Sequence, residues 1–161
     1  NERIAFIWKV SFTKTQITNI NEVYNGSNPF MNEFKAIEKY EKKHHVDVLK
    51  PADFPFDVTD VDTHEDNNTL IIRYRNYKLS GLFQLKIATV NSSLEEYASN
   101  KFESYTLKDG TKALYQPNYI PAKQFLFQRE KIRYTIGISQ STKKNIEVSD
   151  LIKIANSMIS N

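Results

Sequence analysis

The sequence predicts an α+β fold, a curved antiparallel sheet of about five to seven strands with helices packed on one face. Two observations support this prediction. Apolar and polar residues alternate repeatedly between positions 70 and 138, as in strands with one buried and one solvated face. Segments near either end instead carry apolar residues at helical spacing. The 161 residues contain no internal repeat and no Gly/Ser linker, so we predict one domain over 1–161.

The first 25 residues give the weakest signal. The apolar segment Asn1–Val10 is compatible with a short helix or with the start of a strand. Alternation over Ser11–Ile20 favours a strand, and Asn25–Pro29 is a predicted loop. Residues 1–21 either belong to the domain or lead into it from a removed membrane anchor or signal.

Phe30–His45 is predicted to be an amphipathic helix, with Phe34 and Ile37 on its apolar face. We expect His44 and His45 to end this helix, because an imidazolium is favourable near a helix C-terminus. The following prolines predict extended or turn geometry. The acidic, Asn-rich segment 62–68 is expected to be a solvated turn.

The middle and end of the chain predict three antiparallel hairpins and a closing helix. The paired strands are Leu70–Arg75 with Phe83–Ala88, Tyr105–Leu107 with Ala113–Tyr115, and 125–128 with 132–139. Asp109-Gly110 is typical of a tight hairpin turn between the second pair. Asn91–Ala98 is a candidate short helix capped by Ser92 or Ser93, and a final helix begins at about Ser149.

The scarce residue types exclude several classes of active site. The absence of cysteine excludes thiol nucleophiles, zinc–cysteine sites, iron–sulfur sites and disulfides. The four glycines lie too far apart for a phosphate-binding loop or a dinucleotide fingerprint. We therefore predict that the protein is not an enzyme and uses no cofactor.

The formal net charge of +3 is mildly basic. Glu38 and Glu41 accompany the densest basic run, Lys39–Lys43, which is typical of a solvated helix face rather than a nucleic-acid site. We predict no nucleic-acid partner. The longest apolar stretch, Ile4–Val10, contains Lys9 and is much shorter than the roughly 20 residues of a membrane span.

Several stretches carry a family resemblance. They are Asp109–Tyr115, Phe125–Ile136 and Val148–Met158, together with Glu38–Tyr40, Val46–Pro51 and Phe54–Pro55. Over roughly residues 35–160 the chain resembles the family named domain of unknown function 4367. In that family a glycine turn precedes a strand, and a hairpin and a helix close the domain. Phe127-Gln128 stands where the family usually has tryptophan-glutamate.

This resemblance implies location and architecture rather than a mechanism. The family occurs in exported or membrane-tethered proteins of spore-forming Gram-positive bacteria. The resemblance therefore implies an extracytoplasmic domain associated with the cell membrane or wall. It also implies that contact with the membrane is made through an upstream lipoprotein signal or membrane helix.

The residue types that best suit a metal or reactive site are found together at Asp60, Asp62 and His64. The three residues would share one face of a strand and could hold a cation weakly. A calcium loop is not indicated, because its glycine is missing and Ile71 stands at the twelfth position. An ordinary acidic turn explains the same residues, so we predict no metal site and keep the cluster as a weak candidate.

A second candidate is a basic sheet face. Arg73, Arg75, Lys86 and Arg133 all fall on polar positions of predicted strands, with Tyr77 at the edge. If these strands are neighbours, they form a stripe that could dock lipid headgroups, a cell-wall polyanion or an acidic protein. An ordinary solvated sheet face with cross-strand pairs to Glu is the alternative.

The sequence thus predicts a non-catalytic binding or structural module. One alternative is a carrier or sensor that holds a hydrophobic or lipid ligand between sheet and helix. The other is a small hydrolase or metal-binding protein using the region of Asp60, Asp62 and His64. Phe83, Phe125, Phe127 and Tyr134 are assigned to the core rather than to a ligand site.

Overall fold

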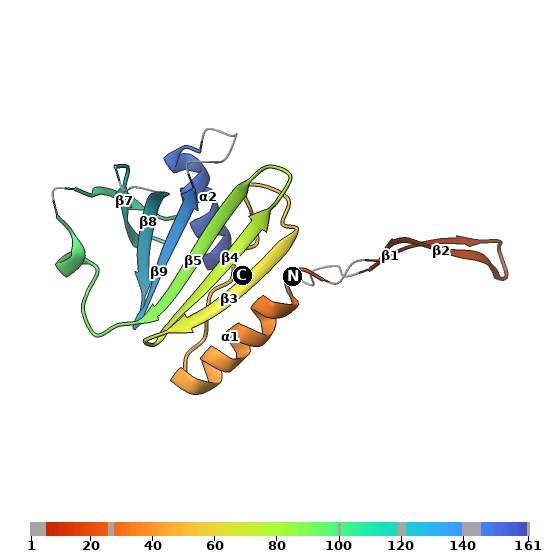
Figure 1. Cartoon of the computed structure of the whole chain (residues 1–161), viewed down its shortest axis with the longest axis horizontal. Helices are drawn as coiled ribbons and strands as arrows, with labels where there is room; N and C mark the ends of the chain where they lie inside the picture. The colour runs from red at the N-terminus through yellow and green to blue at the C-terminus, as the bar shows by residue number, and fades with distance from the viewer. Residues whose placement is uncertain (1–5, 26–27, 100, 119–121, 140–145, 161) are drawn as a thin grey trace.

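The computed structural model describes residues 6–25, 28–99, 101–118, 122–139 and 146–160. Within these residues the chain forms a seven-stranded antiparallel sheet, a separate two-stranded sheet and two α-helices (Figure 1). The predicted α+β class with a curved antiparallel sheet is confirmed.

The large sheet has the order β3-β4-β5-β9-β8-β7-β6. All its neighbouring strands run antiparallel. Its strands are β3 (Asp60–Asp66), β4 (Thr69–Asn76), β5 (Gly81–Thr89), β6 (Glu103–Thr106), β7 (Lys112–Gln116), β8 (Ala122–Arg129) and β9 (Ile132–Ser139). The three predicted hairpins are present. The β5–β9 pairing joins segments far apart in the sequence and makes the sheet continuous.

The predicted acidic turn over 62–68 is wrong for most of its length. Residues up to Asp66 belong to β3, and the reversal is confined to Asn67 and Asn68, whose φ angles are 44° and 63°. Asparagine tolerates this left-handed conformation better than most residues, so two asparagines suffice for a tight hairpin turn. The acidic residues before them therefore stand on an edge strand.

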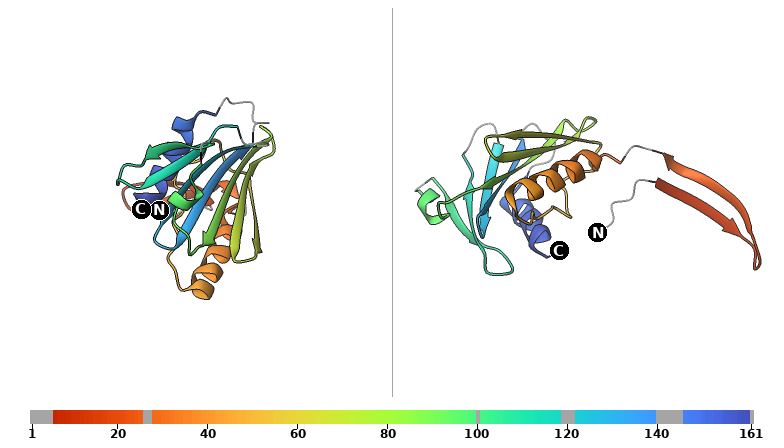
Figure 2. Two further views of the ribbon diagram at one scale, coloured as in Figure 1. Left: turned by 90° about the vertical axis from the view of Figure 1, so that its left-hand side faces the viewer. Right: turned by 90° about the horizontal axis from the view of Figure 1, so that it is seen from below.

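Both α-helices lie on the concave face of the curved sheet (Figures 1 and 2). They are α1 (Met31–His44) and α2 (Val148–Ile159), close to the predicted bounds. His44 ends α1, and His45 follows in a left-handed conformation. At the other helix, Glu147 and Asp150 form a reciprocal capping box.

The core lies between the sheet and these helices. Tyr74 of β4 stacks on Phe83 of β5, and Phe127 of β8 stacks on Tyr134 of β9, each with ring centroids 5.0 Å apart. The helices contribute buried Ile37, Tyr40, Leu151, Ile154, Ala155 and Met158. Neither helix in the described part of the chain has the length and apolarity needed to cross a membrane.

The N-terminal region differs from the prediction. It forms a hairpin of β1 (Phe6–Phe12) and β2 (Ile17–Asn25), so a continuous strand over Ser11–Ile20 is wrong. The chain reverses at 13–16, where the Thr13 N–H donates to the Gln16 carbonyl at 2.9 Å. No Gly, Pro or Asn marks this turn. The hairpin pairs with no strand of the large sheet and projects away from it (Figure 2).

A loop covers part of the convex face of the sheet. Residues 90–99 include a short 3₁₀ helix, η1 (Glu95–Tyr97), in place of the predicted helix over Asn91–Ala98. Leu94 of this loop packs with Leu114 and Leu126 in a small second core, flanked by Phe102. The convex face is therefore divided into a covered part over β7 and β8 and an open part over β3, β4 and β5.

Candidate binding face of the sheet

The open part of the convex face carries charged residues on three neighbouring strands. Asp60 pairs in register with Arg75, and Asp62 with Arg73, across β3 and β4. Lys86 follows on β5, opposite Ile71 of β4. Because side chains alternate along a strand, all five project away from the helices. We call Asp60, Asp62, Arg73, Arg75 and Lys86 the charged face.

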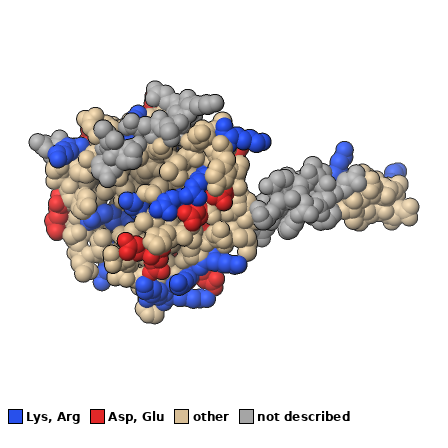
Figure 3. Space-filling model, in the orientation of Figure 1, with Lys and Arg blue, Asp and Glu red and all other residues tan. Residues whose placement is uncertain are grey.

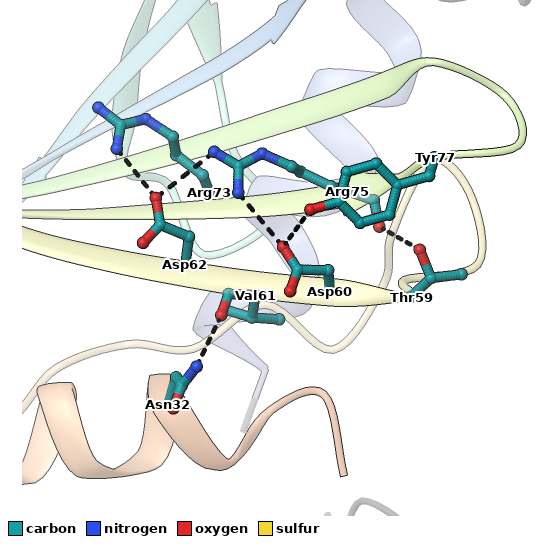
Figure 4. Close-up of polar contacts among 8 residues, drawn as sticks. All are labelled: Asn32, Thr59, Asp60, Val61, Asp62, Arg73, Arg75 and Tyr77. Atoms are coloured by element: carbon teal, nitrogen blue, oxygen red, sulfur yellow. Dashed lines mark hydrogen bonds and ion pairs between the residues drawn. The ribbon is translucent and has the colours of Figure 1, made fainter. Parts of the chain in front are cut away.

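Four of these residues form a cross-strand ladder (Figure 4). Arg73 donates to Asp62 Oδ2 at 3.2 Å. Arg75 donates to Asp60 Oδ2 at 3.2 Å and reaches Asp62 Oδ2 at 3.4 Å. Tyr77 adds a hydrogen bond from its hydroxyl to Asp60 Oδ2 at 3.1 Å. The carboxylates therefore orient the guanidinium groups along the sheet.

The ladder also sets the electrostatics of this face. Partial burial opposes ionisation of Arg75, but its hydrogen bond to Asp60 and the charge of Asp62 outweigh burial and raise its pKa. Lys86 has no ion pair among the described residues. The two carboxylates and three cations sum to one net positive charge. Figure 3 shows a band of basic side chains across this face with acidic side chains beside it.

Arg133 has a different role from the other three predicted cations. Its side chain is on the same side of the sheet, but the residue is only 8% exposed because residues 90–99 cover it. Its Nη2 donates to the Ser92 hydroxyl at 3.1 Å, and its guanidinium lies 4.4 Å from the Tyr97 ring centroid. Arg133 fastens the covering loop to the sheet and is not available to a partner.

The weak acidic candidate does not gather into a reactive centre. Asp60 and Asp62 face the arginines, while His64 is exposed farther along β3 opposite Ile71. His64 lines a shallow surface cavity of about 310 Å³ between α1 and β3. No group of three or more potential metal ligands occurs within the residues that the structure describes.

On the other side of β3, Glu65 faces α1. Lys43 donates to Glu65 Oε1 at 2.6 Å, and this hydrogen bond lowers the Glu65 pKa. The Nε2 atom of His44 lies 3.7 Å from the same carboxylate oxygen. These contacts attach the end of α1 to the edge strand, which is a structural role.

Buried side chains of the described residues pack between the sheet and the helices. Phe83, Phe125, Phe127 and Tyr134 are at most 1% exposed, as the core assignment predicts. A surface cavity of about 500 Å³ lies instead along α2, lined by polar residues that include Asp53, Lys153 and Asn156. Seven of its nine lining residues are polar or charged, whereas hydrophobic and aromatic side chains predominate in lipid sites.

Two features of possible binding surfaces escaped the sequence analysis. Ser92 and Tyr97 hold Arg133, a contact between segments about 40 residues apart that no local pattern encodes. The N-terminal hairpin with its exposed apolar side chains was not predicted, because residues 13–16 carry no turn signal. The alternation of Val10 and Phe12 with polar residues is the sequence feature that indicates this apolar face.

The fold and the charged face together define a small α+β domain with a mixed-charge surface on an open sheet. Comparison with protein-family models, with curated proteins and with solved structures finds no match to this chain. Its function is therefore argued from its own residues.

Proposed function

We propose that this chain is a non-catalytic binding module of the cell envelope, and that its charged face docks an anionic cell-wall polymer. The resemblance noted in the sequence supports an extracytoplasmic location and membrane tethering of the full-length protein. The single observation that carries the docking role is the ordered Arg73–Arg75 ladder beside Lys86.

The ladder leaves binding capacity on each arginine. A guanidinium has five N–H donors, and the contacts above use one on Arg73 and two on Arg75. The remaining donors belong to side chains about one-third exposed. Arginine held in a fixed position loses less entropy on binding a phosphate, and guanidinium matches phosphate geometry. Lys86 supplies the net positive charge.

Two other functions fit the structure less well. A carrier needs a cavity where the buried aromatic side chains now pack. A hydrolase or metal-binding protein needs His64 to meet carboxylates, whereas Asp60 and Asp62 are engaged with arginines. An acidic protein partner is the remaining alternative, and the binding assay separates it from a polymer.

The test is binding of soluble poly(glycerol phosphate), measured by titration calorimetry at low and high salt. The variant Arg73→Gln/Arg75→Gln/Lys86→Gln removes three positive charges from the face. We expect its affinity to fall at least about tenfold, since three exposed charge contacts each contribute up to about 1 kcal/mol. Binding by the unchanged chain should also weaken with salt.

The matched control is Lys108→Gln/Lys131→Gln/Lys153→Gln, which removes the same charge from exposed lysines outside the charged face. This control should retain most of the affinity. Equal losses in both variants would show nonspecific attraction to a basic protein and would contradict the proposal. Failure of the unchanged chain to bind the polymer would contradict it as well. Thermal melting of each variant verifies that it folds.

A further inference from the structure

The β1–β2 hairpin exposes large apolar side chains that no other part of the described chain covers. Phe12 is 75% exposed, Ile17 61%, Ile20 53% and Val10 42%. In the large sheet, by contrast, the apolar side of each central strand lies under helices. A two-stranded hairpin without further packing is marginally stable in water. We therefore expect its apolar residues to be buried against a binding partner.

The four apolar side chains belong to one face of the hairpin. Val10 pairs with Ile20 and Phe12 pairs with Ile17, and paired residues of an antiparallel ladder share a face. An irregularity between Ser11 and Phe12 places Ile17 and Ile20 on the same side although they are three residues apart. Lys9 and Ser11 alternate with these residues and belong to the opposite face. The hairpin is thus amphipathic, and we call Val10, Phe12, Ile17 and Ile20 its apolar face.

The charge of this segment indicates the chemistry of the partner. Residues 9–20 contain Lys9 and Lys14 but no Asp or Glu, and the nearest carboxylate along β2 is Glu22, towards the base. Lys14 lies in the turn at the tip, between the end of β1 at Phe12 and the start of β2 at Ile17. An apolar face accompanied only by cations matches a bilayer with anionic headgroups. Two copies of the tip would instead bring like charges together.

We propose that the apolar face of this hairpin inserts into the surface of an anionic lipid bilayer, with Lys14 beside the phosphates. Insertion is shallow. Both outer edges of a two-stranded hairpin carry unpaired backbone N–H and C=O groups, which must stay hydrated because leaving them in hydrocarbon is costly. The contact is separate from the charged face and does not depend on the polymer proposal.

The chain provides its own probe for this contact. Its single tryptophan, Trp8, belongs to β1. The experiment adds vesicles of equal parts phosphatidylglycerol and phosphatidylcholine to the unchanged chain and follows tryptophan emission. We expect a blue shift and quenching by lipids brominated near the headgroup. Pure phosphatidylcholine vesicles should bind at least about tenfold more weakly.

Two variants and a matched control locate the contact. Phe12→Ser/Ile17→Ser should lower the vesicle partition coefficient at least about tenfold, because two exposed apolar side chains can no longer be buried in lipid. Lys9→Gln/Lys14→Gln should remove most of the preference for phosphatidylglycerol. Met31→Ser/Leu79→Ser removes two exposed apolar side chains from α1 and from the turn after β4, and it should bind vesicles like the unchanged chain.

Three outcomes would overturn the proposal. The first is the absence of a vesicle-dependent shift in the unchanged chain. The second is undiminished vesicle binding by Phe12→Ser/Ile17→Ser, which would place the contact elsewhere. The third is a dimer, detected by light scattering without lipid, that Phe12→Ser/Ile17→Ser dissociates. That result would make a second copy of the chain the partner of the apolar face.

Discussion

The N-terminal hairpin and the large sheet are both antiparallel and amphipathic, yet their apolar faces have opposite surroundings. Tyr74 and Phe83 of the sheet are fully buried, while Phe12 and Ile17 of the hairpin are mostly exposed. The difference is the cover that the chain itself provides. Helices α1 and α2 lie over the sheet, and no described element lies over the hairpin. An alternating pattern thus predicts an apolar face but not what covers it.

The largest expected effect contrasts a buried aromatic residue of the large sheet with an exposed aromatic residue of the hairpin. Phe83→Ala should lower the free energy of unfolding by about 3 to 5 kcal/mol, because it opens a cavity beside the stacked Tyr74 ring. Phe12→Ala should change it by less than about 0.5 kcal/mol in the absence of lipid. Urea unfolding followed by far-UV circular dichroism measures both, since tryptophan emission reports mainly on the hairpin.

A loss above about 1 kcal/mol in Phe12→Ala would contradict this contrast. It would show that the hairpin face packs against protein in solution. The apolar face would then be a structural contact rather than a free docking surface.

The sequence predicted the strands of the sheet well where local chemistry decides the structure. Asp109-Gly110 marks one turn, and alternation around Ser80-Gly81 marks another. The turn predicted over 62–68 rests on its Asp and Asn residues, which favour turns, whereas residues up to Asp66 belong to the edge strand β3. The turn at 13–16 escaped notice because Thr, Lys, Thr and Gln have no strong turn preference.

The charged face was predictable in part, because strand alternation is a local pattern. Arg73, Arg75 and Lys86 share a face because alternation determines the side of each strand. The ion pairs with Asp60 and Asp62 depend on the pairing of β3 with β4, which a predicted turn over 62–68 does not include. The burial of Arg133 depends on residues 90–99 folding back over the convex face of the sheet. Such a contact between distant segments has no local signature.

The second expected effect tests whether water reaches the concave face of the sheet, which the helices cover. Burial raises the pKa of Tyr134 to about 12, although the Leu49 N–H that donates to its hydroxyl acts in the opposite direction. An unfolded tyrosine ionises near pH 10. The folded chain therefore keeps this proton where the unfolded chain loses it. The stabilising contribution of the Tyr134 hydroxyl is complete below about pH 10 and is lost as the pH rises through about 12.

Between pH 9 and pH 12 the titration of Tyr134 should lower the free energy of unfolding by about 2 to 3 kcal/mol. Urea unfolding of the unchanged chain and of Tyr134→Phe over this range isolates it, because phenylalanine cannot ionise. The variant should lose less stability than the unchanged chain as the pH rises. Parallel pH profiles would show that water reaches the Tyr134 hydroxyl and that this side of the sheet is less sealed than its burial indicates.

The smallest expected effect concerns the convex side of the sheet, which is intermediate between the hairpin and the core. Arg133→Met should cost about 1 to 2 kcal/mol, because it removes the hydrogen bonds to Ser92 and the contact with the Tyr97 ring. Lys86→Met, on the open part of the same face, should change stability by less than about 0.5 kcal/mol. Amide hydrogen exchange adds a local readout. Residues 90–99 should exchange faster in Arg133→Met while β4 and β5 keep their protection. Unchanged exchange in the loop would mean that the packing of Leu94 on Leu114 and Leu126 is sufficient to hold it, and that Arg133 does not position the loop.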